Sequence, residues 1–473
     1  MSLVFNDRLL RRAVLALCIV YSAGCLPVTG QVTPEPLREQ LLNGLRVLIW
    51  PRPADQDVLI KLRIHSGAAF DVSGKGGGMA ILGDLLFPDP ATREYFTDEM
   101  AGRLDVETNY DSITVTMQGR ASDFERMVEI LRTALVATQL TPDNVAKIRD
   151  GRIKIAKETG LSSSVLADRA IAARLLGEFP YGRPQSGSSE SIARVDRADL
   201  LLARERFLNP NNATLAITGN VQRKNAIRAL RQLLGSWRKS EQVVPATFRQ
   251  PDLPDVRTLI INAPADQSAE IRLAVRGLSR SDRDVGAANI LAMIARRRWE
   301  KLMPELTRTP VFARHEAHFL PGMFVLGASV NTSMARKALQ TGRDALKSRI
   351  HTPVSTTDLQ QAKTEVIASS APGLAKPEGI AQAWLDIDTF GLPPINEQIL
   401  ALNSVSPADL QRLATRLLRE SAITSVAVGN SDQLKAQLEP HIKVELIGVI
   451  EQPQPDNSKS KPTVKPSPTA KPD

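Results

Sequence analysis

The chain has 473 residues, which is too long for one compact domain and suits two of ordinary size. Hydrophobic residues make up 42% and charged residues 23%, as in soluble globular proteins. The net charge is +9, but Lys and Arg are mixed with acids and form no stripe with interleaved aromatic residues. Nucleic acid is therefore excluded as an expected partner.

Residues 1–30 are predicted to be a signal peptide. Three arginines precede an apolar stretch at residues 13–21 that is too short to span a membrane. Two processing routes remain open, cleavage after Gly30 or lipidation of Cys25 in a segment that resembles a bacterial lipobox. Either route predicts export to the periplasm, or anchoring as an outer-membrane lipoprotein, in a Gram-negative bacterium. In the second case the lipid would be the chain's only link to a membrane.

The next segment, residues 36–239, is predicted to be the first folded domain. Strands are expected at 45–50, 58–65 and 113–118, the last because Ile, Val and Met alternate with Thr, Thr and Gln. A glycine loop at 74–77 precedes a predicted helix from Gly78 to Phe87, and another helix is expected at 123–138. A further helix begins at the capping sequence Thr141-Pro142-Asp143.

The chain then repeats itself. A capped helix start, Val195 to Leu200, is echoed at Val405 to Leu410, and each helix leads to a β run that ends in Gly-Asn. The interval is 210 residues both from Ala198 to Ala408 and from Gly219 to Gly429. A capped helix, a strand and a Gly-Asn pair in register predict an internal duplication.

The duplication defines the second half of the chain. A linker is predicted at 240–255, a second domain at 256–448, and a disordered tail rich in Pro and Lys at 449–473. In the second domain we expect strands at 258–262, 269–275 and 324–330, and helices at 335–349 and from Thr356. The predicted fold class is therefore α+β, with two homologous domains facing each other as a partial clamshell, each a mixed or antiparallel sheet with helices on one face.

From about Glu35 to Gly448 the chain resembles the pitrilysin/insulinase family of zinc peptidases, which includes the mitochondrial processing peptidases. The order and spacing of several segments carry this resemblance: Asn43-Gly44-Leu45-Arg46-Val47, Phe179 to Pro184 followed by Glu190-Ser191-Ile192, Phe207 to Ala213, and Gln267-Ser268 with Ile271.

The family's zinc motif, H-x-x-E-H, is degenerate in this chain. The resemblance places Ile81 and Leu85 at the two histidine positions, Asp84 at the general-base position, and Ile155 at the position of the third zinc ligand, a glutamate. Ile and Leu have no lone pair for a metal. An aspartate beside no activated water has nothing to deprotonate. The resemblance therefore implies that the chain has no catalytic residues, metal or cofactor.

The family also grips peptide with an Arg and a Tyr that lie seven residues apart, and alignment places Thr307 and Arg314 there. A glycine-rich loop of the family corresponds to Arg296-Arg297-Arg298-Trp299, which reads either as a basic contact surface or as a solvated helix end. The only histidine cluster, His315-Glu316-Ala317-His318, lies in a predicted loop or strand that would direct the two rings to opposite sides.

The sequence thus favours a catalytically inactive peptidase-like subunit. Its expected partners are a zinc-bearing homologue or a second copy of itself, together with peptide or unfolded protein segments. Two alternatives remain open. One is an active metalloendopeptidase with an unrecognised metal site, and the other is a structural scaffold of the cell envelope.

Overall fold

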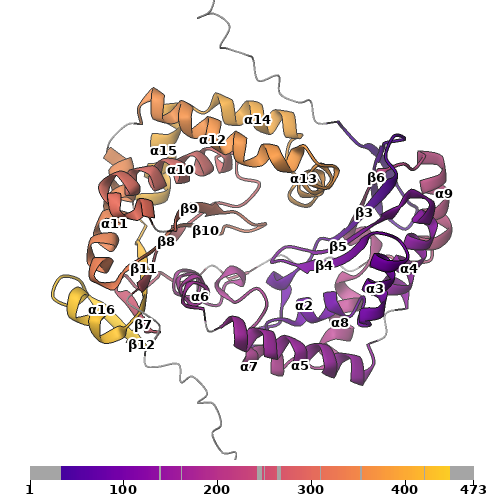
Figure 1. Ribbon diagram of the computed structural model, residues 1–473, viewed down its shortest axis with the longest axis horizontal. Coiled ribbons are helices and arrows are strands. Elements are labelled where there is room, and N and C mark those ends of the chain that lie inside the picture. Colours follow the sequence, from indigo (N-terminus) through magenta and orange to yellow (C-terminus); the bar gives the residue numbers. More distant parts are fainter. Residues whose placement is uncertain are drawn as a thin grey trace, which may run out of the picture.

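The computed structural model describes residues 34–447 except 138–139, 161, 242–247, 250, 264–267, 309, 352–353 and 420. The predicted signal peptide with Cys25, and the tail at 449–473, lie outside these residues. The described part contains two six-stranded sheets, each with its own set of helices, which curve toward each other in Figure 1. Within this part, no helix combines the length and the apolar character needed to cross a bilayer.

The first sheet has the strand order β1-β2-β6-β3-β5-β4. Its central strands β6 and β3 consist almost entirely of buried residues because both faces of the sheet are covered. The strands are β1 (Leu37–Gln40), β2 (Arg46–Pro51), β3 (Asp57–Ile64), β4 (Arg103–Thr108), β5 (Ile113–Arg120) and β6 (Ala213–Gly219).

The second sheet has the order β12-β7-β11-β8-β10-β9. In both sheets a parallel pair, β2 with β6 or β7 with β11, is followed by three strands that pair antiparallel. Its strands are β7 (Thr258–Asn262), β8 (Ser268–Arg276), β9 (Val311–Glu316), β10 (Met323–Asn331), β11 (Thr424–Gly429) and β12 (Val444–Ile447). The predicted α+β class is confirmed. Five strands of each sheet share one order and direction, whereas the sixth differs: β1 pairs antiparallel with β2, and β12 pairs parallel with β7. The origin of the two halves by duplication stays a prediction.

Helices accompany each sheet, most of them on its outer face (Figure 1). Those of the first half are α2 (Gly78–Asp84), α3 (Pro90–Asp98), α4 (Phe124–Val136), α5 (Pro142–Thr159), α6 (Ser163–Leu176), α7 (Ser189–Ala193), α8 (Arg197–Phe207) and α9 (Arg223–Leu234). Those of the second half are α10 (Val285–Leu302), α11 (Ala335–His351), α12 (Thr356–Leu374), α13 (Pro377–Phe390), α14 (Ile395–Ser404), α15 (Pro407–Leu418) and α16 (Ser431–Leu438).

Each half also gives one helix to the opposite sheet. Helix α6 of the first half packs Ile171 and Leu175 against the inner face of the second sheet, at Val325 and Val426. Helix α13 of the second half packs Trp384 against Leu48 and Trp50 of the first sheet. Sequence patterns did not predict this exchange, because a helical pattern does not indicate which sheet the helix will cover.

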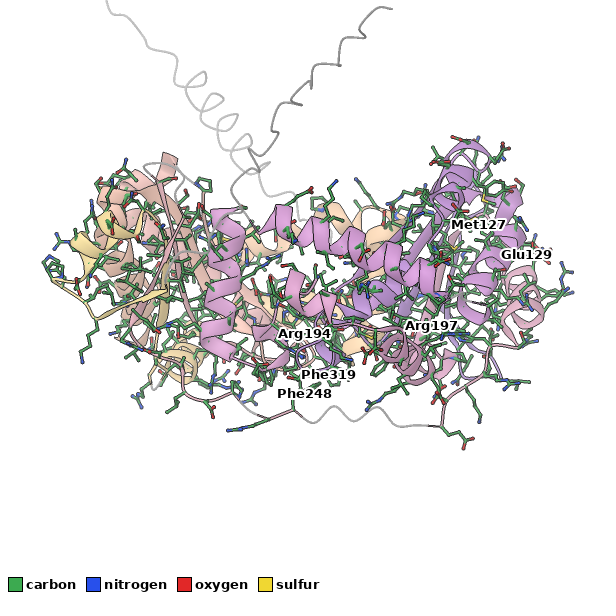
Figure 2. The ribbon with its side chains drawn as sticks, turned by 90° about the horizontal axis from the view of Figure 1, so that it is seen from below. Met127, Glu129, Arg194, Arg197, Phe248 and Phe319 are labelled. Atoms are coloured by element: carbon green, nitrogen blue, oxygen red, sulfur yellow. The ribbon has the colours of Figure 1, made fainter. Side chains whose placement is uncertain are left out.

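The two halves also meet at the β9–β10 hairpin. Asp111 accepts hydrogen bonds from Tyr181 Oη (2.9 Å) and from the Phe319 amide (3.3 Å), and it pairs with His318 Nδ1 at 3.1 Å. The Tyr181 and His318 rings lie 4.3 Å apart. Figure 2 shows Phe319 near the middle of the molecule, between its two ends. This cluster fixes the hairpin of the second half to the first half.

Candidate functional site

The helix at the zinc-motif position, α2, begins at a glycine turn. Gly77 precedes it with φ 95°, a left-handed conformation in which a Cβ would lie 2.8 Å from Ile192 Cγ1. The carboxylate of Asp71 caps the helix by accepting from the amides of Gly77 and Met79, both at 2.7 Å. Burial nevertheless raises the pKa of Asp71 to about 6, against these two hydrogen bonds. The sequence pattern did not reveal this cap.

Both histidine positions of the motif are part of the core. Ile81 and Leu85 are 0% exposed and belong to the main hydrophobic cluster of the first half. The helix ends at Asp84, three residues before the predicted end at Phe87, and Leu85 is its C-cap. Complete burial of each aliphatic side chain favours folding by about 1.5–3 kcal/mol. These positions therefore serve packing.

The general-base position, Asp84, is held by a cation. Arg152 Nε on α5 donates to Asp84 Oδ2 at 2.7 Å, and both side chains are about a quarter exposed. This ion pair joins α2 to α5, the two helices that carry the degenerate metal positions. The role of Arg152 was not predicted from sequence.

The third position does not join the other two. Ile155 is 61% exposed, whereas its neighbours Ile153 and Ala156 pack against the core. The side chain that α5 sends to α2 belongs instead to Arg152. The alignment of positions 81, 85 and 155 with the family's zinc ligands stays a prediction. Of these three residues, only Ile81 and Leu85 belong to one buried cluster. The side chains of Ile81, Leu85 and Ile155 are aliphatic and offer a zinc ion no donor atom. These residues therefore do not fit zinc.

The peptide-grip positions lie on the second half. Thr307 lies in the short 3-10 helix Pro304–Arg308, and its side chain is outside the described residues. Arg314 lies on the edge strand β9, where its Nε donates to Glu316 Oε1 at 2.5 Å and its guanidinium stacks 4.4 Å from the Phe312 ring. The Arg314 side chain is about half exposed and is already neutralised by a neighbour on its own strand.

The histidine cluster is divided, as the strand periodicity predicted. His315 Nε2 accepts from the Leu278 amide at 2.9 Å, and burial lowers the pKa of His315 to about 4. His318 instead points to Asp111 of the first half. Over the residues that the structure describes, no three His, Cys, Asp or Glu side chains gather in a geometry that could hold a metal ion.

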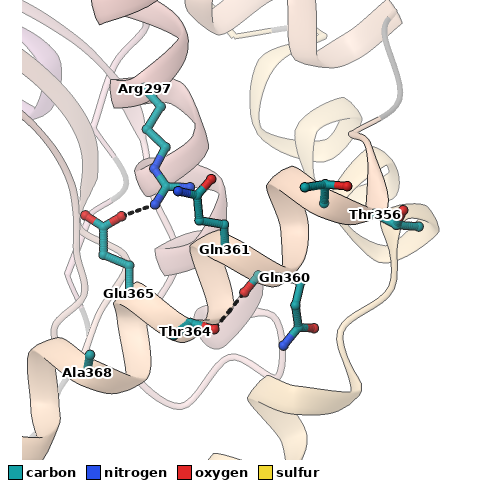
Figure 3. Close-up of a pocket in the computed structure, with 8 residues that line it drawn as sticks. Arg297, Thr356, Gln360, Gln361, Thr364, Glu365 and Ala368 are labelled. Carbon is teal, nitrogen blue, oxygen red and sulfur yellow. Dashed lines mark hydrogen bonds and ion pairs between the residues drawn. The ribbon is translucent and has the colours of Figure 1, made fainter. Parts of the chain in front are cut away.

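The arginine run at 296–298 lies inside α10 and is partly neutralised. Arg296 Nη2 bonds Glu365 of α12 at 2.6 Å, and Arg297 also pairs with Glu365. Arg297 and Glu365 help to line an open hollow of about 910 Å³. Figure 3 shows the ion pair between them. The hollow is otherwise lined by Thr356, Thr357, Gln360, Gln361, Thr364 and Ala368, all on α12. The run is therefore part of a helix–helix contact, and Trp299 beside it is fully buried.

A different feature beside α2 is the outer edge of β4. Within the described residues β4 pairs only with β5 and ends the sheet. The Asn109 amide donates to Ser112 O, so these two residues form a hydrogen-bonded pair of the antiparallel ladder. Because hydrogen-bonded and non-hydrogen-bonded pairs alternate, the backbone N–H and C=O groups of Leu104, Val106 and Thr108 point away from β5. Gln185 Nε2 already donates to Thr108 O at 3.0 Å. A Cβ at Gly83 would lie 2.6 Å from Thr108 Oγ1, so α2 flanks this edge closely.

Comparisons with known proteins agree with this geometry. Residues 194–366 match the sequence profile described as the Peptidase M16 inactive domain. An uncharacterized zinc protease of Mycobacterium bovis is 27% identical over 216 residues, which cover 44% of this chain and 49% of that protein. Human cytochrome b-c1 complex subunit 1 is 22% identical over 222 residues, or 46% of each protein. The chain thus spans about half the length of the curated relatives it matches.

Solved structures resemble most of the chain. A protease from Helicobacter pylori superposes with a TM-score of 0.76 at 17% identity, covering 84% of this chain and 99% of that structure. A Peptidase M16 inactive domain from Pseudomonas fluorescens gives 0.75 at 16% identity, with 84% and 98% covered. Residues 194–366 thus resemble the Peptidase M16 inactive domain, and about half of the chain is similar in sequence to curated zinc proteases. The predicted resemblance to pitrilysin-type peptidases is confirmed.

Proposed function

We propose that the chain is a catalytically inactive, exported M16 subunit that binds extended peptide and partners a zinc-bearing homologue. The observation that carries the proposal is the complete burial of Ile81 and Leu85 in the core, next to β4, whose outer edge pairs with no strand among the described residues. Aliphatic packing stabilises the helix where catalysis would need metal ligands. An edge strand offers backbone donors and acceptors that an extended peptide can satisfy.

The outward edge of β4 supplies the peptide-binding element in this proposal. Val106 is half-buried beside α2, and its amide and carbonyl point away from β5. A peptide strand added here would bond to the backbone at Leu104 and Val106, while side chains at alternate positions meet α2. Chemical cleavage of that peptide would fall to the partner subunit.

Proline at position 106 tests the edge directly. Val106→Pro removes an outward amide while leaving the inward bonds of β4 to β5 in place. The matched control is Ala313→Pro on β9, whose backbone also points outward, because Ser329 N donates to Pro310 O at 3.2 Å and fixes the alternation of that strand. With fluorescent unfolded peptides and anisotropy as the readout, we expect Val106→Pro to weaken binding by about tenfold or more. Equal loss in both variants would refute a β4 site.

Partnering is tested by co-expression with a homologue that has an intact H-x-x-E-H motif. We expect co-elution on size exclusion and faster peptide cleavage by the complex than by the homologue alone. The control is a complex containing Val106→Pro, which should form but lose the gain in rate. Separate elution with unchanged turnover would favour a scaffold role, the alternative suggested by the similarity to human cytochrome b-c1 complex subunit 1.

A further inference from the structure

Helix α9 and the residues after it form a surface of one charge sign. Residues 222–239 contain six basic residues and no acid. Lys224, Arg228 and Arg231 follow the spacing i, i+4, i+7 and therefore form one stripe on the exposed side of the helix, whose other side packs Ile227 and Leu230 into the core. In Figure 1 this helix lies at the outer edge of the first half.

Acids from neighbouring elements neutralise only part of this surface. Arg223 pairs with Glu39 of β1, and Arg228 lies 3.7 Å from Glu125 of α4, a contact in which both side chains are about two-thirds exposed. Lys239 lies 4.0 Å from Glu241. In the part of the chain that the structure describes, Lys224, Arg231 and Arg238 form no salt bridge. The pairs of Arg228 and Lys239 are long and exposed and contribute little, so the surface stays positive.

An exposed leucine stands at one end of the basic surface. Leu42, in the turn between β1 and β2, is fully exposed at 107%. The turn is fixed against the C-terminal end of α9, because Asn43 Nδ2 donates to Leu234 O (2.8 Å) and Trp237 O (3.1 Å). A rigid turn thus holds an apolar tip next to the segment that carries Arg238 and Lys239. The turn therefore presents the Leu42 side chain to solvent beside the basic segment.

We propose that this surface, defined by Lys224, Arg228, Arg231, Arg238, Lys239 and Leu42, docks on an anionic phospholipid membrane. Each Lys or Arg near a negatively charged bilayer adds to the electrostatic attraction. An apolar side chain beside these cations can insert at the boundary between the headgroups and the acyl chains. An acidic protein would complement the arginines and the lysines but would need an apolar pocket for a single protruding leucine. The combination of a basic stripe with an isolated apolar tip favours a lipid surface. This docking is independent of acylation at Cys25 and of the proposed peptide binding.

Vesicle sedimentation tests the docking. The purified chain carries Cys25→Ser, so that no acyl group contributes, and is mixed with vesicles of equal parts phosphatidylglycerol and phosphatidylcholine or of phosphatidylcholine alone. We expect binding to the anionic vesicles only, reduced when NaCl rises from about 0.1 to about 0.5 M. The triple variant Lys224→Glu, Arg231→Glu, Arg238→Glu should bind at least about tenfold more weakly, and Leu42→Ser should bind several-fold more weakly.

Matched variants separate the surface from net charge. Lys147→Glu, Lys154→Glu, Lys157→Glu on α5 changes the net charge equally on another exposed helix, and Leu202→Ser removes a leucine that is 67% exposed on α8. Both controls should bind as the parent does. Equal loss in the α5 variant, or absence of binding to anionic vesicles, would overturn the proposal. If the parent binds no anionic vesicles but captures a purified acidic protein domain, and the triple variant does not capture it, the surface would be assigned to a protein partner instead.

Discussion

The buried guanidinium of Arg63 on β3 donates to the carboxylate of Asp386 on α13 at 2.5 Å, which ties the first sheet to a helix of the second half. The converse contact exists in the other sheet, where Arg272 on β8 donates to Asp168 on α6, also at 2.5 Å. Both arginines are at most 2% exposed. A buried arginine therefore anchors a helix of the other half to each sheet. Asp386 of α13 neutralises Arg63, and Asp168 of α6 together with Glu270 neutralises Arg272.

Removing one partner of this pair should destabilise the whole chain. Asp386→Ala leaves the Arg63 charge buried, so we expect the free energy of unfolding to fall by about 2–4 kcal/mol, because Asp386 itself is a quarter exposed. Urea denaturation followed by circular dichroism measures this. The double variant Arg63→Met, Asp386→Leu should recover part of the loss. The surface pair Arg52–Asp55 is the control, and Asp55→Ala should change stability by less than about 0.5 kcal/mol.

The cap of α2 should make stability depend on pH. Burial raises the pKa of Asp71 to about 6 in the folded chain, whereas an unfolded aspartate titrates near 3.9. The folded state therefore holds this proton more tightly, and the contribution of Asp71 to stability is greatest below about pH 4 and falls as the pH rises to about 6. Asp71→Asn does not titrate. Relative to it, the parent should lose about 2–3 kcal/mol of unfolding free energy between pH 4 and pH 7. A difference that is constant over this range would contradict the assigned burial.

Restoring the zinc motif should not produce a peptidase. Ile81→His and Leu85→His each place a polar ring in the core and should cost about 2–5 kcal/mol, whereas the exposed Ile155→Glu should be nearly neutral. Together with Asp84→Glu, these changes should give no peptide turnover, because position 155 does not lie with the other two. Urea unfolding, zinc content after dialysis and a fluorogenic peptide assay test this. Robust turnover would show that α5 can bring residue 155 to the metal.

The contact between the halves at Asp111 should control access to the β9–β10 hairpin. Asp111→Ala removes the acceptor for Tyr181 and for the Phe319 amide, and we expect stability to fall by about 2–3 kcal/mol. Chymotrypsin should cleave at Phe319 sooner in this variant, since that side chain is already half exposed. Asp111→Asn keeps one acceptor oxygen, so its stability and its cleavage rate should lie between those of the parent and of Asp111→Ala. Asp105→Ala on the exposed edge strand is the control, and equal cleavage in all variants would argue that the hairpin is held by other contacts.

Part of this architecture could be predicted from sequence with good accuracy. The strand at Thr258–Asn262 has the bounds given by its β-branched run, and the helix predicted at 123–138 is found at Phe124–Val136. Asp196 and Ser406 are the N-caps of their helices, as the sequence predicted, and each also forms a capping box. These features depend on neighbours within a few residues of each other, which is why a sequence pattern contains them.

The site was predicted less completely. That Ile81 and Leu85 cannot bind zinc follows from their chemistry alone, but their full burial, the exposure of Ile155 and the ion pair from Arg152 do not. Position 155 lies on a long helix whose rotation about its own axis decides which side chain meets α2. A shift of three residues on that helix moves the contact from Ile155 to Arg152, and both fit a helical pattern equally well.

The sequence by itself thus determined the fold class, the shared element order of the halves and the aliphatic side chains at positions 81, 85 and 155, because these depend on local periodicity and on the atoms of each side chain. Only the tertiary structure decided which sheet each inner helix covers, which carboxylate neutralises Arg63 and Arg272, and which edge of β4 stays open. Those outcomes join residues more than a hundred positions apart, and the buried charges and backbone groups that they satisfy become costly only after the chain has closed around them.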